Sequence, residues 1–300
     1  MNKTCIIIAG PTAVGKTSMA IQLAQHFSTQ IISADSRQCY QELNIGVAKP
    51  SAMELSIAQH YFINSHSVSQ NVTAADYEKY ALLSADTIFL KNDKAIMVGG
   101  TGLYIKAFAE GLDEIPDIEE LLRTSIVTDY NNGGIQWLQE QIKKQDPDYF
   151  IYGEMQNPQR MMRALEVKIS TGKSIRSFQS KLKKQRNFNC IKIGLELPRE
   201  ILYERINARV DKMMENGLLE EAESLLPYKH LSALQTVGYL ELFDYFDNKI
   251  SFENAVALIK QNSRNYAKRQ MTWFKKDKEM NWVDMQDEGN AFTTILLNVE

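Results

Sequence analysis

The sequence has few of the residues that form disulfides or transition-metal sites. Its three cysteines, Cys5, Cys39 and Cys190, lie far apart, and its four histidines are scattered. Neither a disulfide framework nor a CxxC metal site is therefore indicated. No stretch approaches the roughly 18 apolar residues of a membrane-spanning helix. The apolar run Cys5–Ala9 is too short for a signal peptide and leads into a glycine-rich turn. We expect a cytoplasmic protein with no membrane partner.

An excess of one charge is also missing. The formal net charge of −3 over 300 residues creates no overall field that would attract a nucleic acid. The charge is nevertheless uneven: residues 1–159 hold 11 basic and 18 acidic side chains, whereas residues 160–192 hold 10 and 1 and residues 260–278 hold 7 and 1. Any affinity for RNA must therefore come from the two basic blocks.

Strands and helices are predicted to alternate in the first hundred residues. The apolar run Cys5–Ile8 predicts a strand buried on both faces, and apolar residues at helical spacing follow as far as Phe27. Further strands are predicted at Gln30–Ala34 and Ala95–Val98, and a helix begins near Leu103. This alternation is typical of an α/β fold with a parallel sheet.

The middle of the chain has a different pattern. Between about residues 118 and 185 the sequence is polar and helical, with no convincing strand. Alternating apolar residues at 191–197 then predict a strand that returns to the sheet. We therefore expect a core formed by residues 1–117 and 189–300, interrupted by a helical insertion at 118–188. The C-terminal third is predicted to be helical, at about 200–226, 232–246 and 252–277.

A phosphate-binding loop is predicted directly after the first strand. The pattern G-x-x-x-x-G-K-[ST] is matched completely by Gly10, Pro11, Thr12, Ala13, Val14, Gly15, Lys16 and Thr17. In such a loop main-chain N–H groups and the helix N-terminus bind phosphate oxygens. Lys16 adds a positive charge, and the Thr17 hydroxyl is placed to bind Mg²⁺. Taken alone, the loop favours a bound nucleotide, usually ATP.

The predicted strand Ala95–Val98 lacks the acidic residue by which kinases and ATPases usually hold Mg²⁺, because it ends in Gly-Gly-Thr-Gly. This absence disfavours ATP hydrolysis. The carboxyl ends of parallel strands meet in one crevice, so the phosphate loop, Asp35 and Thr101 are expected to converge. Asp35 fits a general base and a helix N-cap equally well. Thr101 taken alone fits a turn or cap residue better than a phosphate contact.

Several ordered blocks resemble the bacterial tRNA dimethylallyltransferases, also called tRNA isopentenyltransferases, over nearly the whole chain. The blocks are Gly10–Thr17, Asp35–Tyr40, Ile45–Pro50, Val98–Tyr104, Asn157–Glu166, Val237–Tyr239 and Lys268–Phe274. The resemblance implies a P-loop core related to nucleotide kinases, with a helical insertion that grips the anticodon arm. The implied reaction moves dimethylallyl from its diphosphate to the exocyclic amine of adenosine 37 of tRNA. It releases diphosphate and requires Mg²⁺.

The same resemblance implies roles for individual residues. Gly10–Thr17 would bind the diphosphate, with Lys16 as a catalytic group. Asp35 would take the proton from the amine, and Thr101 would hydrogen-bond the bridging oxygen of the leaving group. Contacts with tRNA are expected from Ser36, Arg37, Gln38, Arg123, Gln159, Arg160, Met161, Met162 and Arg163, together with Asp35 and Thr101.

Other basic and aromatic residues leave two readings open. Arg205, Arg209 and Lys212 form one helical stripe, which either closes over the diphosphate or is solvated, and Arg209 is weakly favoured as a ligand. The run Lys181–Arg186 fits contact with an RNA backbone slightly better than a solvated face. Trp273 and Phe274 fit core packing better than stacking on a base.

Two segments depart from the family pattern. Val47 replaces a common threonine, and residues 59–64 differ from the usual His-His-Leu-Ile-Asp. These departures concern the substrate pocket more than the reaction class. The alternatives are a P-loop small-molecule kinase, a transferase that prenylates free adenine nucleotides, and a non-catalytic RNA-binding module. A monomer is expected.

Overall fold

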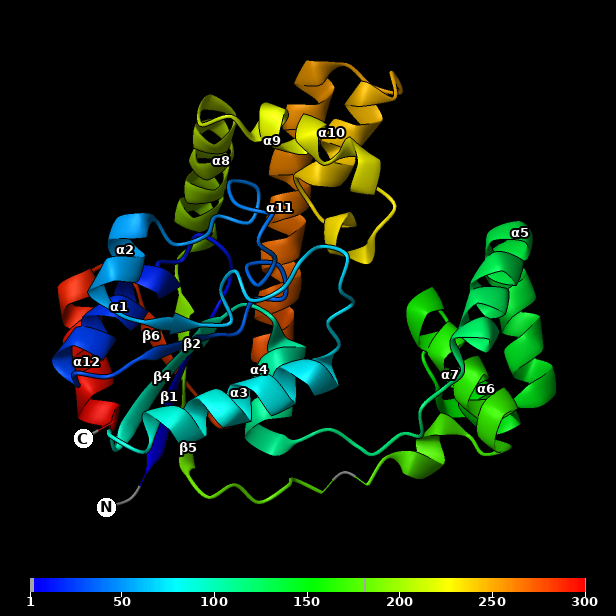
Figure 1. Cartoon of the computed structure of the whole chain (residues 1–300), viewed down its shortest axis with the longest axis horizontal. Coiled ribbons are helices and arrows are strands. Elements are labelled where there is room, and N and C mark those ends of the chain that lie inside the picture. The colour runs from blue at the N-terminus through cyan, green and yellow to red at the C-terminus, as the bar shows by residue number, and fades with distance from the viewer. Residues whose placement is uncertain (1–2, 181, 300) are drawn as a thin grey trace. The chain divides into compact units, whose positions relative to one another are not determined.

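The structure, a computed structural model, describes residues 3–180 and 182–299 (Figure 1). Internal contacts divide the chain into two units. One unit is built from the residues up to Glu110 and from Gln185 onward, and the other is Gly111–Lys184. The insertion expected at 118–188 differs from the second unit by a few residues at each limit.

The first unit is built on a six-stranded parallel sheet with the order β3-β2-β4-β1-β5-β6. Its strands are β1 (Thr4–Ala9), β2 (Ile31–Ser33), β3 (His60–Tyr61), β4 (Lys94–Gly99), β5 (Asn189–Glu196) and β6 (Met280–Asp284). Every residue of β1 is buried, as expected for a central strand. The predicted parallel α/β core is confirmed.

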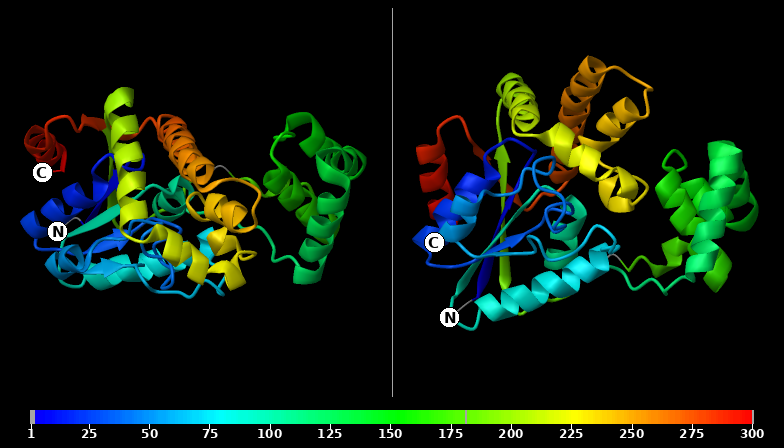
Figure 2. Two further views of the ribbon diagram at one scale, coloured as in Figure 1. Left: turned by 90° about the horizontal axis from the view of Figure 1, so that it is seen from above. Right: turned by 45° about the horizontal axis from the view of Figure 1, so that its top comes forward.

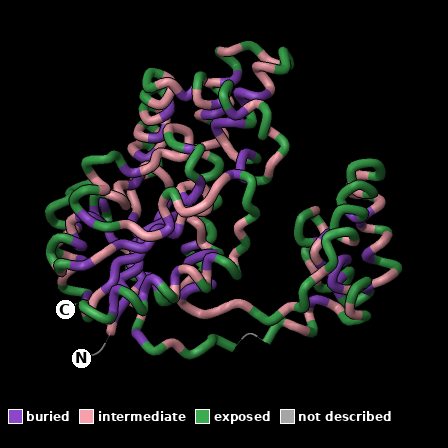
Figure 3. Tube along the Cα trace, in the orientation of Figure 1, coloured by how far each residue is buried: buried purple, intermediate pink, exposed green. Residues whose placement is uncertain are grey.

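Helices cover both faces of this sheet (Figure 2). They are α1 (Lys16–His26), α2 (Ala52–Ile57), α3 (Ala74–Ile88), α4 (Gly102–Glu110), α8 (Arg199–Glu215), α9 (Leu218–Ser224), α10 (Tyr239–Phe246), α11 (Phe252–Phe274) and α12 (Glu288–Val299). Side chains alternate along β1, so Ile6 and Ile8 pack in one cluster with α1 and α12, whereas Cys5 and Ile7 pack in another with α3 and α4. Figure 3 shows this buried sheet at the centre of the unit.

The helices predicted at about 200–226, 232–246 and 252–277 are confirmed by α8, α9, α10 and α11. Residues 280–284, for which no element was predicted, form the edge strand β6, which pairs only with β5. Its alternation is incomplete, because only Met280 and Val283 of its five residues are buried. The two-residue strand β3 was also not predicted. The other predicted strands lie at β1, β2, β4 and β5.

The second unit is helical in its described part, residues 111–180 and 182–184, with no strand there, as predicted. It contains α5 (Glu120–Gln145), α6 (Pro147–Tyr152), α7 (Pro158–Thr171) and a 3₁₀ turn at Ile175–Phe178. Gly134 interrupts α5 with a φ of 66°. Leu138, Ile142 and Leu165 belong to a hydrophobic core of this unit alone. Across both units, no described helix is long and apolar enough to cross a bilayer.

Candidate active site

The phosphate loop connects β1 to α1 at the carboxyl edge of the sheet. Gly10 and Gly15 have φ angles of 152° and 104°, which side chains rarely allow, and Ala13 between them has a φ of 65°. These turns let the loop curl back over its own strand before α1 begins at Lys16. A helix N-terminus with a curled loop in front of it is suited to binding a phosphate group.

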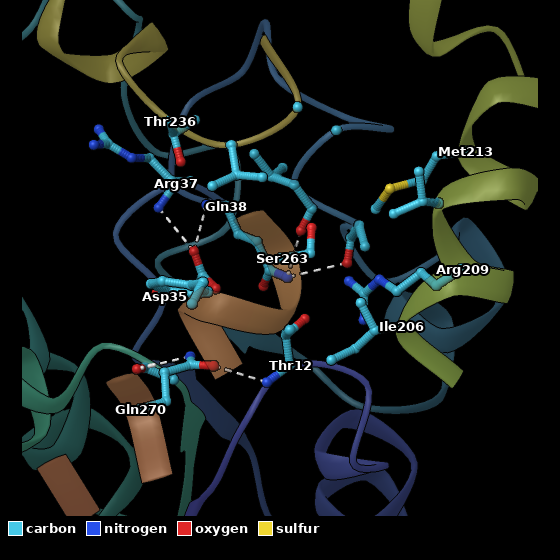
Figure 4. Close-up of a pocket in the computed structure, with 18 of the residues that line it drawn as sticks. Thr12, Asp35, Arg37, Gln38, Ile206, Arg209, Met213, Thr236, Ser263 and Gln270 are labelled. Carbon is cyan, nitrogen blue, oxygen red and sulfur yellow. Dashed lines mark hydrogen bonds between the residues drawn. The ribbon is translucent and has the colours of Figure 1, made fainter. Parts of the chain in front are cut away.

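A pocket opens beside this loop, and six segments that are distant in sequence contribute to it (Figure 4). Its charged side chains are Lys16, Arg37, Arg209 and Asp35, three cations and one carboxylate. The remaining lining includes Thr12, Thr17, Gln38, Val47, Gly99, Gly100, Ile206, Met213, Thr236, Ser263, Tyr266 and Gln270. The excess of positive charge suits a polyanion, and the apolar side chains beside it suit a hydrocarbon group.

Lys16 is held inside this pocket by its own loop. Its Nζ donates a hydrogen bond of 2.7 Å to the carbonyl oxygen of Pro11. Burial, and then the nearby guanidinium of Arg209, lower the pKa of Lys16 to about 7, although Asp35 opposes the shift. Burial also lowers the pKa of Arg209. A bound anion would compensate both cations.

Of the stripe Arg205, Arg209 and Lys212, only the first two reach this region. Arg209 lines the pocket itself, and Arg205 lines an adjoining cavity with Thr17. Lys212 is exposed and lines neither cavity. The solvated reading therefore holds for Lys212, and the ligand reading holds geometrically for Arg209.

Asp35 follows β2 and uses one carboxylate oxygen to shape the chain. Oδ1 accepts hydrogen bonds from the main-chain N–H groups of Arg37, at 2.8 Å, and Gln38, at 3.3 Å. Its other oxygen accepts no hydrogen bond from residues 3–180 or 182–299, and Asp35 is one of the residues that line the pocket. No helix begins after Asp35, so the helix N-cap reading is wrong, and Asp35 caps a turn instead. This turn contact uses one oxygen and leaves the general-base reading open for the other.

Thr101 lies beside Asp35 and does not itself line the pocket. Its hydroxyl accepts a hydrogen bond of 3.1 Å from the N–H of Ser36, and its own N–H donates to the carbonyl of Ala34. The carbonyl of Thr101 accepts from Tyr104 in the first turn of α4. Thr101 thus has the turn role that its sequence favoured, and its contact with a leaving group stays a prediction.

The residues 36–38 that are expected to contact the nucleotide differ in how their side chains are engaged, and those contacts stay predictions. The amide nitrogen of Gln38 donates to the carbonyl oxygens of Val47, at 3.2 Å, and Ala48, at 3.1 Å. Gln38 therefore supports the loop that carries Val47, and its amide nitrogen is not free for an RNA base. Ser36 is engaged with Thr101, whereas Arg37 lines the pocket and its guanidinium has no hydrogen-bond or ion-pair partner among the described residues.

Two residues that support the site were given no role from the sequence. Glu221 on α9 accepts hydrogen bonds from the N–H groups of Ile45, at 2.7 Å, and Gly46, at 3.0 Å, and from the hydroxyl of Tyr239, at 2.6 Å. It fixes the loop beside the pocket. Gln270 on α11 contacts the phosphate loop. Gln270 falls in a family block, whereas no local pattern distinguishes Glu221 from its acidic neighbours.

The expected tRNA contacts in the insertion fall into two groups. Gln159 and Arg160 are exposed, and Arg160 forms an ion pair with Glu154. Met161 and Met162, by contrast, are buried in the core of the unit, so their side chains support the helix, and their expected contact with tRNA stays a prediction. They follow Arg160 on α7, whose period turns successive side chains inward.

The arginines of this insertion are held partly by one carboxylate. Arg123 and Arg163 both pair with Glu166, at 3.4 Å and 3.1 Å. Each keeps about a third or more of its side chain exposed, at 44% and 34%. Both therefore retain donors that can reach an RNA phosphate.

Within the basic block at residues 160–192, Arg186 has a structural role. Arg186 forms a half-buried ion pair of 2.7 Å with Glu78 and also donates to the carbonyls of Ala107 and Phe108. This residue is not available to an RNA backbone. Lys181, the first residue of the run Lys181–Arg186, lies outside the described residues. Phe274 is buried, whereas Trp273 is 38% exposed and packs against Gly102.

Comparisons with known proteins agree with this arrangement. The family model described as IPP transferase matches residues 38–277. A tRNA dimethylallyltransferase of Christiangramia forsetii is 48% identical over 98% of both chains, and one of Flavobacterium johnsoniae is 49% identical over 96% of this chain and 95% of its own. The solved tRNA isopentenylpyrophosphate transferase of Bacillus halodurans superposes with a TM-score of 0.73 at 34% identity, covering 99% and 95% of the two chains. A eukaryotic dimethylallyltransferase described as acting on tRNA superposes with a TM-score of 0.80 at 25% identity, and the match covers 96% of this chain and 75% of that one.

Proposed function

The chain belongs to the IPP transferase family, and we propose that it transfers dimethylallyl from dimethylallyl diphosphate to the N6 amine of adenosine 37 of tRNA. The observation that carries this proposal is the single pocket in which a phosphate loop, a cation excess, apolar walls and Asp35 meet. Curated relatives that cover nearly the whole chain are transferases with this name.

The reaction forms one bond between N6 and the first carbon of the dimethylallyl group and breaks the bond from that carbon to the diphosphate oxygen. The bonding electron pair leaves with diphosphate. Asp35 takes the proton that N6 loses, a role that typically accelerates such a step by about 10²–10⁴-fold. Lys16, Arg209 and the loop N–H groups stabilise the charge that develops on the leaving oxygens.

A magnesium ion fits this site if the diphosphate supplies most of its ligands. The described residues contain no cluster of three or more acidic, histidine or cysteine side chains that would hold a metal alone. The Thr17 hydroxyl and the Asp35 carboxylate line adjoining walls of the pocket and are hard oxygen donors of the kind that Mg²⁺ prefers. When bound, the ion would neutralise diphosphate charge, and Thr17 is the residue that would hold it.

The acceptor adenine must leave the stack of the anticodon loop to enter the pocket, as bases commonly do in enzymes that modify them. Single-stranded loops are suitable targets because their bases can splay out. Arg37 at the pocket and Gln159, Arg160, Arg163 and Arg123 in the insertion supply polar and charged groups for the anticodon arm. The salt dependence of binding should report on those phosphate contacts. We place this reaction in the cytoplasm and assign it to a monomer.

One assay separates this proposal from its alternatives. The protein is incubated with Mg²⁺, ATP, labelled dimethylallyl diphosphate and either unmodified tRNA carrying adenosine 37 or free AMP. Label transferred to tRNA, with diphosphate released, supports the proposal. Label transferred to AMP alone would favour the free-nucleotide transferase, and ATP consumption without label transfer would favour a kinase. The same tRNA with guanosine at position 37 is the matched control.

A further inference from the structure

Gln270 is buried between two loops that carry the expected catalytic groups. Its side-chain oxygen accepts a hydrogen bond of 2.8 Å from the main-chain N–H of Thr12, in the phosphate loop. Its amide nitrogen donates one of 3.0 Å to the carbonyl oxygen of Gly100, in the turn after β4 (Figure 4). The side chain is only 6% exposed. One residue of α11 thus joins segments that lie 258 and 170 positions away.

The two partners require a primary amide at this position. The N–H of Thr12 needs an acceptor, and the carbonyl of Gly100 needs a donor. Glutamine offers both from one side chain, whereas an ionised glutamate offers acceptors only and an apolar side chain offers neither. Because the site is buried, removing the donor or the acceptor of this side chain leaves one main-chain group without a hydrogen bond, which costs about 1–3 kcal/mol.

The turn after β4 is shaped to receive this contact. A Cβ atom at Gly100 would lie 2.1 Å from Nε2 of Gln270, so only glycine lets the amide approach the carbonyl. A Cβ atom at Gly102 would lie 2.1 Å from Nε1 of Trp273, three residues further along α11. Two side chains of one helix therefore rest on the glycine positions on either side of Thr101.

Hydrogen bonds and neighbouring residues together link the phosphate loop to the expected base. Gln270 joins Thr12 to Gly100, Thr101 follows Gly100, and the Thr101 hydroxyl accepts from the N–H of Ser36, next to Asp35. The N–H of Thr12 is occupied by this contact, so the loop is left to bind an anion through its other N–H groups and Lys16.

We propose that Gln270 is a positioning residue that sets the spacing between the leaving-group site and the base. This inference rests on the proposed prenyl transfer. A displacement of about 1 Å at a reacting centre can reduce the rate by about 10²-fold. Gln270 also lines the pocket, but both polar atoms of its side chain are engaged, so it acts through Thr12 and Gly100.

Gln270→Glu provides the test, because a carboxyl group restores the missing donor only when it is protonated. Burial and the facing carbonyl oxygen raise the pKa of such a carboxyl group. The ratio of kcat for Gln270→Glu to kcat for the wild type should therefore be close to one near pH 5.5 and should fall by about 10–100-fold by pH 8.5. Taking the ratio cancels the titration of the free substrate.

The matched control is Gln261→Glu, an exposed glutamine of the same helix, for which the ratio should stay constant with pH. Gln270→Leu, which lacks donor and acceptor at every pH, should lose activity throughout the range, with tRNA affinity retained. A constant ratio for Gln270→Glu, or normal kcat in a folded Gln270→Leu, would overturn the proposal.

The failure of this inference can be told from the failure of the proposed function. Prenylation by the wild-type protein decides the function. If the wild type is inactive, pyrophosphate binding still tests the link between Gln270 and the phosphate loop. The affinity of Gln270→Glu relative to the wild type should then fall as the pH rises, and a pH-independent ratio would reject the link.

Discussion

Arg209 and Lys16 face the same pocket from α8 and from the phosphate loop, and the guanidinium adds to burial in lowering the pKa of Lys16 to about 7. Two cations are thus held together in a place that partly desolvates both. The two positive charges repel each other without a ligand and are both compensated by a diphosphate. Because Lys16 loses its proton near pH 7, the affinity for diphosphate should depend on pH.

The first prediction concerns that pH dependence. In the free protein Lys16 is protonated below about pH 7, and a bound anion raises its pKa, so binding takes up a proton above pH 7. The contribution of Lys16 to pyrophosphate affinity should be full below pH 7 and should fall by up to about tenfold for each pH unit above it. Calorimetry on the wild type and on Lys16→Ala isolates this contribution, because the ionisation of pyrophosphate is common to both. A pH-independent difference between the two proteins would contradict it.

Asp35→Asn should separate the role of Asp35 as a base from its role in holding the turn at residues 35–38. The amide keeps an acceptor for the N–H groups of Arg37 and Gln38 but cannot take a proton. We expect turnover to fall by about 10²–10⁴-fold, while tRNA and pyrophosphate binding are retained. Asp35→Ala, which also removes the turn acceptor, should lower stability in addition. Single-turnover prenylation measures the first effect, and near-normal turnover by Asp35→Asn would exclude Asp35 as the base.

Glu221→Gln should loosen the loop that carries Val47. The carboxylate accepts from Ile45, Gly46 and Tyr239, and a neutral amide presents one acceptor fewer. Loss of a hydrogen bond to a charged group costs about 1.5–3 kcal/mol, so KM for dimethylallyl diphosphate should rise by roughly tenfold or more. Hydrogen exchange of residues 45–48 should accelerate. Glu220→Gln, at an exposed neighbour, is the control. Equal hydrogen exchange of residues 45–48 in both variants would argue against the role of Glu221 in fixing this loop.

Gly99→Ala should destabilise the core unit through a clash with the main chain of β2's end. A Cβ atom there would lie 2.2 Å from the main-chain oxygen of Ala34, and that backbone cannot yield without breaking the β2–β4 pairing. The free energy of unfolding should fall by about 3 kcal/mol. Gly289→Ala, on α12, meets its nearest atom at 3.5 Å and should be tolerated. Urea denaturation compares the two, and equal midpoints would refute the steric argument.

Arg160→Ala should affect tRNA binding and Met161→Ala should affect stability, although the two residues are adjacent. Arg160 is exposed, so its loss should weaken tRNA binding and reduce the salt slope by about 0.7–0.9. Met161 is fully buried, so its truncation should cost about 2–5 kcal/mol of stability in the insertion. Binding titrations over a range of salt, with thermal unfolding, measure both. Weaker tRNA binding by a stably folded Met161→Ala, at an unchanged salt slope, would support the contact expected of Met161.

The local features of this protein were determined by its sequence. Glycine spacing, Lys16 and Thr17 specify the phosphate loop, because only that pattern curls main-chain N–H groups around an anion. Strand periodicity predicted β1, β2, β4 and β5, and the carboxyl-edge rule placed Asp35 and Thr101 beside the loop. The edge strand β6 escaped prediction because its alternation is incomplete.

Long-range contacts were decided only by the tertiary structure. Nothing within a few positions of Gln270 or Glu221 reveals that one binds Thr12 and the other the loop at Gly46, since hydrogen bonds between distant segments leave no local pattern. The same holds for burial: Met161 and Arg160 are neighbours in sequence, and only the packing of α7 turns one inward and leaves the other exposed. The sequence therefore determined which chemical groups are present, and folding determined which of them act on the substrate and which hold the others in place.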